Sequence, residues 1–255
     1  MDVIMELIFN KYQLFLLVMI RTSGIFIFSP FFSSQNIPNT MKIGLSFSVS
    51  LLITSVLSIS PDLSNEIFLL LIIKELMVGI IIGFISYAFF SAFYVMGQIV
   101  DMKIGFGMAN VIDPQNKIQV PLMGNFYYIL SFLLLMSMNG HHSIISALID
   151  SYNFIPIGSF KYTGDTMNLL VYSLSKSFEI GFKLSTPIVA IIFLTDVVLG
   201  IISKTIPQMN VFVVGMPLKV LIGLLIILIS MPIFFTAIGG IFDLIINDIY
   251  RFIKI

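Results

Sequence analysis

Long apolar runs separated by short polar stretches form the main pattern of the sequence. A helix of about 20 apolar residues crosses a hydrocarbon core of about 30 Å. Most of the runs reach this length, and two fall just short of it. The pattern therefore predicts an all-α, integral membrane-type protein of helical hairpins. The six apolar blocks are Tyr12–Phe32, Ile43–Ile59, Ile67–Val95, Leu122–Met138, Leu169–Ile202 and Val211–Ile238.

The third, fifth and sixth blocks are longer than an upright span requires. At about 1.5 Å per residue they should tilt, break or project out of the bilayer. Pro187, Pro217 and Pro232 lie inside the last two blocks, where each removes a backbone donor and favours a kink. Gly79 and Gly83 form a Gly-x-x-x-Gly spacing, which either lets another helix approach closely or arises by chance in an apolar helix.

The stretch between the third and fourth blocks is predicted to be a buried connection, residues 96–120. Its first part is too interrupted by Gly and polar residues to span, yet too apolar for a solvated loop. Gly105, Phe106, Gly107 and Met108 combine a bulky ring and a pliable thioether with flexible hinges. This chemistry suits a plug that can move aside, and equally an interfacial stretch that packs on neighbouring helices.

Two other connections are predicted. Residues 139–151 hold both histidines, His141 and His142, which lack metal-ligand spacing and suit hydrogen bonding at a helix start. Residues 203–210 form a tight turn, which makes the last two blocks an antiparallel hairpin.

Eight charged residues lie inside the blocks. A charge at the centre of a spanning helix costs about 2.5–3.5 kcal/mol, so such residues are usually paired, interior or functional. Lys176 and Glu179 are spaced i,i+3, and Glu179 and Lys183 are spaced i,i+4, so they can pair along one helix. Their pattern leaves open a neutralised helix face, contacts between subunits, and an ion or proton path. The eight residues are Arg21, Lys74, Glu75, Lys176, Glu179, Lys183, Asp196 and Lys219.

Composition and charge narrow the classes of function. Of the 255 residues 58% are hydrophobic and 10% charged, against roughly 25% charged in soluble domains, so the chain must be buried in lipid, in partners, or in both. The net charge is zero, which argues against nucleic-acid binding. If all six blocks span the membrane, four basic loop residues lie on each side of it. The excess of basic residues that usually marks the cytoplasmic side is then missing, so loop charge does not set the orientation of the chain in the membrane.

No enzymatic motif is present. The sequence lacks cysteine, a Walker A loop and a Gly-x-Ser-x-Gly elbow, and Asp196 is the single aspartate within the blocks. We therefore expect a protein without catalytic residues, metal or cofactor.

An ordered set of motifs along nearly the whole chain resembles the FliR family of flagellar export-gate proteins, which is related to the T subunit of virulence type III secretion systems. Each motif is weak by itself, and their order makes the resemblance specific. The motifs are Arg21-Thr22-Ser23-Gly24, Pro30-Phe31-Phe32, Ile37-Pro38, Gly97-Gln98-Ile99-Val100-Asp101, Gly105-Phe106, Asp113-Pro114, Asn139-Gly140-His141-His142, Ser151, Pro207-Gln208-Met209-Asn210-Val211-Phe212 and Pro217-Leu218-Lys219.

This resemblance implies a subunit that assembles with FliP and FliQ into a closed helical gate and associates with FlhB in the bacterial inner membrane, at the flagellar basal body. It implies a FliP-like portion, residues 1–160, followed by a FliQ-like hairpin, residues 161–255. Much of the family's helical mass is lifted above the membrane plane, which would account for the tied loop charges and the charges within the blocks.

The resemblance also assigns the candidate site residues. Gly105, Phe106, Gly107 and Met108 match the region that protrudes into the gate and helps to close it, although Gly107 departs from the family pattern and adds flexibility. Pro207, Gln208, Met209 and Asn210 match the cytoplasmic tip of the hairpin, near FlhB. We thus expect a non-enzymatic gate subunit that contacts lipid and passes unfolded substrates. The alternative is a self-contained secondary transporter for a small solute, coupled through the charges within the blocks.

Overall fold

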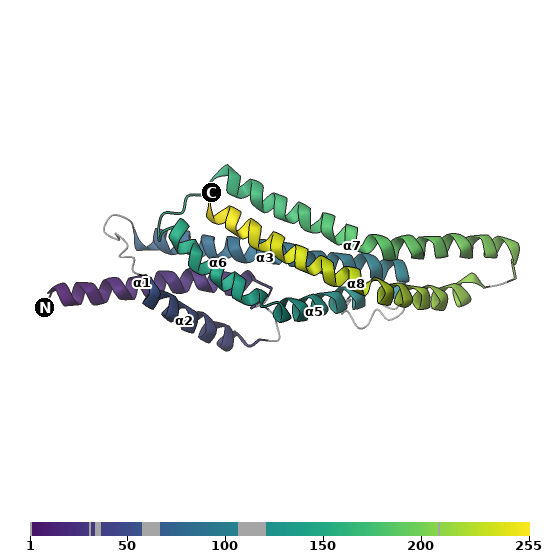
Figure 1. Ribbon diagram of the computed structural model, residues 1–255, viewed down its shortest axis with the longest axis horizontal. Helices are drawn as coiled ribbons and strands as arrows, with labels where there is room; N and C mark the ends of the chain where they lie inside the picture. The colour runs from purple at the N-terminus through teal and green to yellow at the C-terminus, as the bar shows by residue number, and fades with distance from the viewer. Residues whose placement is uncertain (1, 31, 34–36, 58–66, 107–120, 209) are drawn as a thin grey trace. The chain divides into compact units, whose positions relative to one another are not determined.

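The computed structural model describes residues 2–30, 32–33, 37–57, 67–106, 121–208 and 210–255, and the regular structure in these ranges is helical (Figure 1). This confirms the predicted all-α class. The helices are α1 (Asp2–Phe28), α2 (Asn39–Val56), α3 (Phe68–Ile104), α5 (Leu122–Ser137), α6 (Gly140–Phe154), α7 (Gly164–Thr205) and α8 (Val211–Ile253).

Four of the described helices are long and apolar enough to cross a membrane: α1, α3, α7 and α8. The number rises to five if α5 and α6 are counted together as one broken span. The 42 residues of α7 correspond to about 63 Å of helix, roughly twice the hydrocarbon thickness. The blocks predicted to be overlong are therefore overlong helices, and α7 and α8 continue past Pro187, Pro217 and Pro232.

Two segments predicted to be connections are helical instead. Residues 96–104 are the last turns of α3, because Met96, Val100 and Ile104 recur every fourth residue and are all buried. Residues 140–154 form α6, which begins after Asn139 in the left-handed conformation at φ 56°. The Gly and polar residues in these segments misled the prediction because burial against other helices outweighs their weak helix propensity.

The chain folds into two compact units, each made of stretches that are far apart in sequence. The first comprises Met1–Phe89, Asn139–Leu174 and Asp243–Ile255, and the second comprises Phe90–Met138 and Ser175–Phe242. These units are defined by packing. They do not test the division at residue 160, which concerns likeness to other proteins and stays a prediction.

The first unit is held by close packing between α1 and α3. A Cβ atom on Gly79 would lie 2.1 Å from the carbonyl oxygen of Arg21, and one on Gly83 would lie 2.9 Å from Cβ of Phe28. The Gly-x-x-x-Gly spacing is therefore a helix-packing motif, as one of the two interpretations predicted. Leu17, Val18 and other apolar side chains on both sides of this contact are fully buried.

The second unit has an aromatic core between α3, α5 and α8. The Phe93 ring lies 5.7 Å from the Phe234 ring, and the Tyr127 ring lies 4.9 Å from the same ring. Phe90 contacts Tyr128 edge to face at 5.1 Å. Such ring pairs contribute about 0.5–1.5 kcal/mol beyond the apolar area that they bury, so this core fixes how α3 packs against its neighbours.

Candidate functional site

The predicted plug begins where α3 ends. The N–H of Gly105 donates to the carbonyl of Asp101 at 3.0 Å, and Gly105 has a φ of +100°, which a residue with a side chain rarely adopts. Phe106 follows, half-buried. Gly107 and Met108 lie outside the described residues. The stretch from Gly105 to Pro121 contains the four residues predicted to form a plug, and we call it the gate segment after that prediction.

Asp101 joins the two helices that flank the gate segment. Asp101 is buried, with 5% of the residue exposed, and its carboxylate accepts hydrogen bonds from the backbone N–H groups of Met123, at 3.0 Å to each oxygen, and Gly124, at 3.3 Å. One helical turn earlier, a Cβ atom on Gly97 would lie 2.2 Å from Cα of Gly124. The last turns of α3 therefore touch the first turn of α5 backbone to backbone.

A buried ion pair lies at the α1–α3 contact of the first unit. The Nε of Arg21 donates to Oε2 of Glu75 at 2.7 Å, and both side chains are 0% exposed. The close approach at Gly79, four residues after Glu75, brings the two helices near enough for this pair. Two opposite charges without access to water are stable only if their remaining polar atoms also find partners.

Those partners come from α6 and the residues that follow it. Arg21 donates from Nη1 to Oγ of Ser151 at 3.0 Å and from Nη2 to the carbonyl of Ile155 at 3.1 Å. Its guanidinium carbon lies 4.2 Å from the centre of the Tyr152 ring. Arg21 thus makes three hydrogen bonds and one cation–π contact. The planar guanidinium group of arginine is suited to making both kinds of contact at once.

The connection between α6 and α7 is held by the same junction. The N–H of Gly158 donates to Oε1 of Glu75 at 3.0 Å, and Nζ of Lys74 donates to the Gly158 carbonyl at 2.8 Å. Gly158 adopts φ +80°. We call the set of Arg21, Lys74, Glu75, Ser151 and Gly158 the charge junction. Four members, Arg21, Lys74, Glu75 and Ser151, were noted in the sequence as charges in apolar blocks or as part of a motif, and Gly158 was not. The hydrogen bonds within the set join residues up to 130 positions apart, so no local spacing reveals them.

Three charged residues of α7 pair with one another at the helical spacings that the sequence predicts: Lys176, Glu179 and Lys183. Lys176 Nζ is 2.9 Å from Oε2 of Glu179, and Lys183 Nζ is 2.5 Å from Oε1 of the same residue. These pairs are largely exposed in the chain. Asp196 of α7 forms an ion pair with Lys219 of α8. Since the two residues lie at similar distances from the turn, this pair agrees with the predicted antiparallel hairpin.

The tip of that hairpin is exposed. Pro207 and Gln208 form a turn, and Met209 lies outside the described residues. Asn210 precedes α8, and its carbonyl accepts the N–H of Val213 at 3.1 Å.

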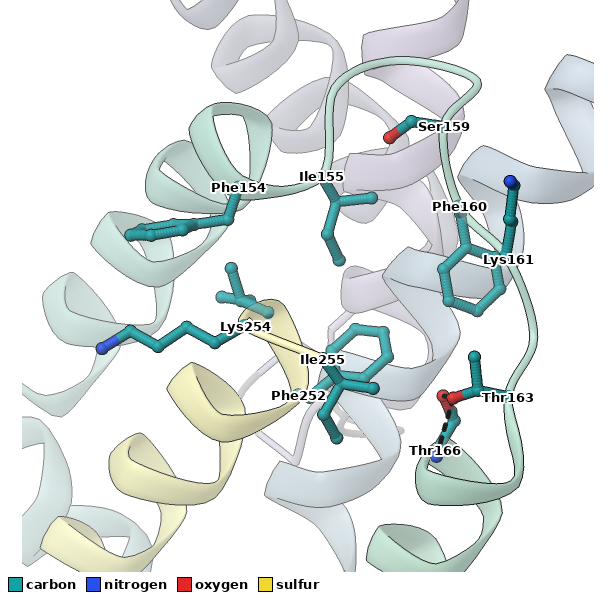
Figure 2. A pocket seen from close by; sticks show the side chains of 11 residues that line it. Phe154, Ile155, Ser159, Phe160, Lys161, Thr163, Thr166, Phe252, Lys254 and Ile255 are labelled. Atoms are coloured by element: carbon teal, nitrogen blue, oxygen red, sulfur yellow. Dashed lines mark hydrogen bonds between the residues drawn. The ribbon is translucent and has the colours of Figure 1, made fainter.

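A pocket of about 540 Å³ opens beside the ends of α6 and α8 (Figure 2). Its interior is lined by apolar side chains such as Ile155, Phe160 and Phe252, while Lys161 and Lys254 point outward on opposite sides of it. The polar groups therefore do not converge on one point. The described residues also contain no group of three or more His, Cys, Asp or Glu side chains that could hold a metal ion.

Comparisons with known proteins give the family. Residues 12–245 match the family model of the bacterial export proteins, family 1. The chain is 36% identical to the flagellar biosynthetic protein FliR of Bacillus subtilis over 249 residues, which cover 95% of each chain. It is 33% identical to FliR of Aquifex aeolicus over 80% of this chain and 79% of that protein.

A relative with a different name also matches. The surface presentation of antigens protein SpaR of Shigella sonnei is 27% identical over 224 residues, covering 87% of this chain and 86% of that protein. The matches span both compact units, and they agree with the membrane-length apolar helices of the fold. The chain therefore belongs to family 1 of the bacterial export proteins, together with FliR.

Proposed function

We propose that this chain is a non-enzymatic core subunit of a type III protein-export gate in the bacterial inner membrane. In this proposal it forms the channel together with FliP and FliQ homologues, associates with an FlhB homologue, and helps to seal the passage against leakage while unfolded substrates are not in transit. The observation that carries the proposal is the family match over residues 12–245 of an all-helical, apolar chain.

The surface of the chain supports a role within an assembly. Large apolar side chains are exposed along α7 and α8, for example Phe182, Phe193 and Leu228. An apolar surface of this extent needs lipid or protein against it. The exposed Lys176, Glu179 and Lys183 lie on a membrane-length helix, and charges facing lipid are costly, so this stretch suits contact with another subunit.

The gate segment supports a sealing role. It starts at a glycine with open space around its Cβ position, followed at once by an aromatic residue. Its two ends are held together by Asp101 and Gly97. A bulky apolar group on a fixed base is suited to block a narrow passage, because it excludes water and ions without forming a covalent or charged barrier.

The charge junction does not favour the transporter alternative. Coupling sites in transporters must bind and release ions. Arg21 and Glu75 are instead saturated by fixed partners from α6 and from the residue Gly158, an arrangement that suits a permanent structural bond.

The proposal is tested by co-expression and conductance. The chain should co-purify with FliP and FliQ homologues, and the assembled complex should be closed to ions in a planar bilayer. Replacing Phe106 and Met108 with glycine removes the bulky groups and should make the complex conduct. Met102→Ala provides the control, because Met102 is 72% exposed on α3 and precedes the segment.

Two results would count against the proposal. If the chain purifies and transports a solute without partners, the subunit role is wrong. If the Phe106 and Met108 variant assembles normally and conducts no more than the Met102→Ala control, the sealing role of this segment is wrong.

A further inference from the structure

We propose that the pocket at the ends of α6 and α8 is a docking site for an acidic segment of a partner protein, in which an apolar side chain lies between carboxylates. The residues that line this pocket are all described, and all belong to the first compact unit. None of them belongs to the predicted plug or to the hairpin tip, so a docking role here does not depend on the gate function.

The walls of the pocket are fixed before any partner binds. The connection between α6 and α7 forms one wall, and the charge junction holds it, because Arg21 donates to the carbonyl of Ile155 at 3.1 Å. The end of α8 forms another wall, and Tyr250 ties it to α6 by donating a hydrogen bond to Oδ2 of Asp150 at 2.5 Å. A preformed pocket loses little conformational freedom when it is filled, which favours binding.

The interior of the pocket suits an apolar side chain. Its volume of about 540 Å³ lies within the range of about 300–1,000 Å³ that is usual for ligand pockets. Ile155 and Phe252 line it and are buried, and the Phe160 ring lies 6.1 Å from the Phe252 ring. Phe154 also lines the pocket and is 53% exposed, so apolar surface remains open to a partner.

The hydroxyl groups of the lining are already engaged within the chain. Ser159 donates to the carbonyl of Pro156 at 2.7 Å, and the hydroxyls of Thr163 and Thr166 form a hydrogen bond of 3.1 Å with each other. A polar small molecule therefore finds few groups to hold it, since such ligands need several placed donors and acceptors. The polar groups left for recognition are the ammonium groups of two lysines.

These lysines favour a ligand with negative charge on both sides of its apolar part. Lys161 and Lys254 are exposed and point outward on opposite sides of the pocket (Figure 2). In the described part of the chain neither forms an ion pair, and the residues that line the pocket include no acidic side chain. Nζ of Lys254 lies 5.9 Å from the centre of the Phe154 ring, a contact that leaves its charge available to a carboxylate.

A phospholipid fits this arrangement less well than a protein segment does. Its phosphate is a single centre of negative charge on which cations converge, whereas these two ammonium groups diverge. The helix ends nearby are also polar: Asp165 at the start of α7 is exposed, and so are Asp243 and Asn247 near the end of α8. Exposed charges are costly in hydrocarbon, so this end of the unit suits water and protein.

The test measures the binding of defined peptides to the full chain in phosphatidylcholine nanodiscs. The probe is a fluorescently labelled peptide, Asp-Glu-Asp-Leu-Phe-Leu-Glu-Asp-Glu, whose several carboxylates on each side allow for different spacings to the lysines. One control peptide carries lysine in place of each acidic residue, and the other carries serine in place of each apolar residue. Fluorescence anisotropy gives the dissociation constants.

We expect the acidic apolar peptide to bind more tightly than either control peptide by about tenfold, equivalent to about 1.4 kcal/mol. Lys161→Gln and Lys254→Gln should each weaken its binding about threefold, and the double variant about tenfold, because glutamine removes the charge and each exposed ion pair contributes modestly. Lys11→Gln removes an exposed charge from α1 and should leave binding unchanged.

Two results would overturn the docking site. One is equally tight binding of the acidic and basic peptides to the unaltered chain, and the other is undiminished binding of the acidic peptide to the double lysine variant. Native mass spectrometry of the chain with phosphatidylglycerol tests the lipid. Retention of this lipid that falls in the double variant, while the acidic peptide shows no preference, would assign the pocket to a lipid headgroup instead.

Co-purification separates the docking site from the proposed function. A chain that prefers the acidic peptide but does not assemble with FliP and FliQ homologues supports the docking site and contradicts the gate role. A chain that assembles with those homologues but shows no preference among the peptides contradicts the docking site alone.

Discussion

The ion pair between Arg21 and Glu75 offers a quantitative test of what holds the first unit together. We consider Arg21→Met, Glu75→Met and the double variant. Methionine approximates the length of both side chains and is flexible enough to fill the space that they leave. The single variants each remove one charge from a pair that is 0% exposed, whereas the double variant removes both.

The structure sets the expected magnitudes. Arg21→Met leaves the Glu75 carboxylate buried with the N–H of Gly158 as its remaining partner, and breaking a buried pair in this way costs about 3–5 kcal/mol. Glu75→Met should cost a similar amount. The double variant leaves no buried charge, and its main cost is the unpaired Ile155 carbonyl and Gly158 N–H, at about 1–3 kcal/mol each.

At the midpoints of these ranges, about 8 kcal/mol for the two single variants together and about 4 kcal/mol for the double variant, the double variant should cost about 4 kcal/mol less than the sum of the single variants. The assay is denaturant titration in mixed micelles with helicity followed by circular dichroism, from which the free energy of unfolding is obtained. The matched control is the Glu179–Lys183 pair, which is exposed on α7 and should show no comparable coupling. Additive costs at Arg21 and Glu75, or single costs below about 1 kcal/mol, would refute the reasoning.

Two other perturbations test the packing and the hairpin. Gly79→Ala should lower the free energy of unfolding by about 1–3 kcal/mol, because its Cβ would lie 2.1 Å from the Arg21 carbonyl oxygen. The control Gly44→Ala, at a position with open space around it, should raise the free energy of unfolding by about 0.4–1 kcal/mol. The same denaturant titration measures both variants, and equal effects would contradict the packing argument. Lys219→Leu should reduce the membrane-inserted fraction measured by carbonate extraction, because it leaves Asp196 unpaired in an apolar helix at about 2.5–3.5 kcal/mol, and adding Asp196→Leu should restore that fraction. An undiminished fraction in Lys219→Leu would show that the pair is not needed for insertion.

Much of the fold follows from hydrophobic patterning. The blocks that exceed 20 apolar residues correspond to the membrane-length helices, and the spacing of Gly79 and Gly83 correctly allowed for a helix contact. Predictions failed where a helix contains Gly and polar residues that are buried, as at residues 96–104 and 140–154. Local propensity disfavours helix there, and the compensating contacts, such as Gly97 against Gly124, come from distant parts of the chain.

The candidate site, too, could be predicted from the sequence only in part. The motif Gly105-Phe106 could be singled out from sequence, since its unusual composition is local. The capping role of Asp101 could not, because its partners lie 22 and 23 residues away across a stretch without a regular pattern. A proline before α5 was the one local signal that a cap had to come from elsewhere.

The sequence by itself determined the class of the protein. Its residues are 58% hydrophobic and lie in long runs, which must be buried in lipid or against partners, and without water the backbone satisfies its hydrogen bonds by forming helices. Tertiary structure alone decided which charges are paired with which. Arg21 and Glu75 are 54 residues apart, and they meet because glycine lets α1 and α3 approach until their backbones touch. Pairing of this kind depends on distances between helices, and those distances are set by packing in three dimensions.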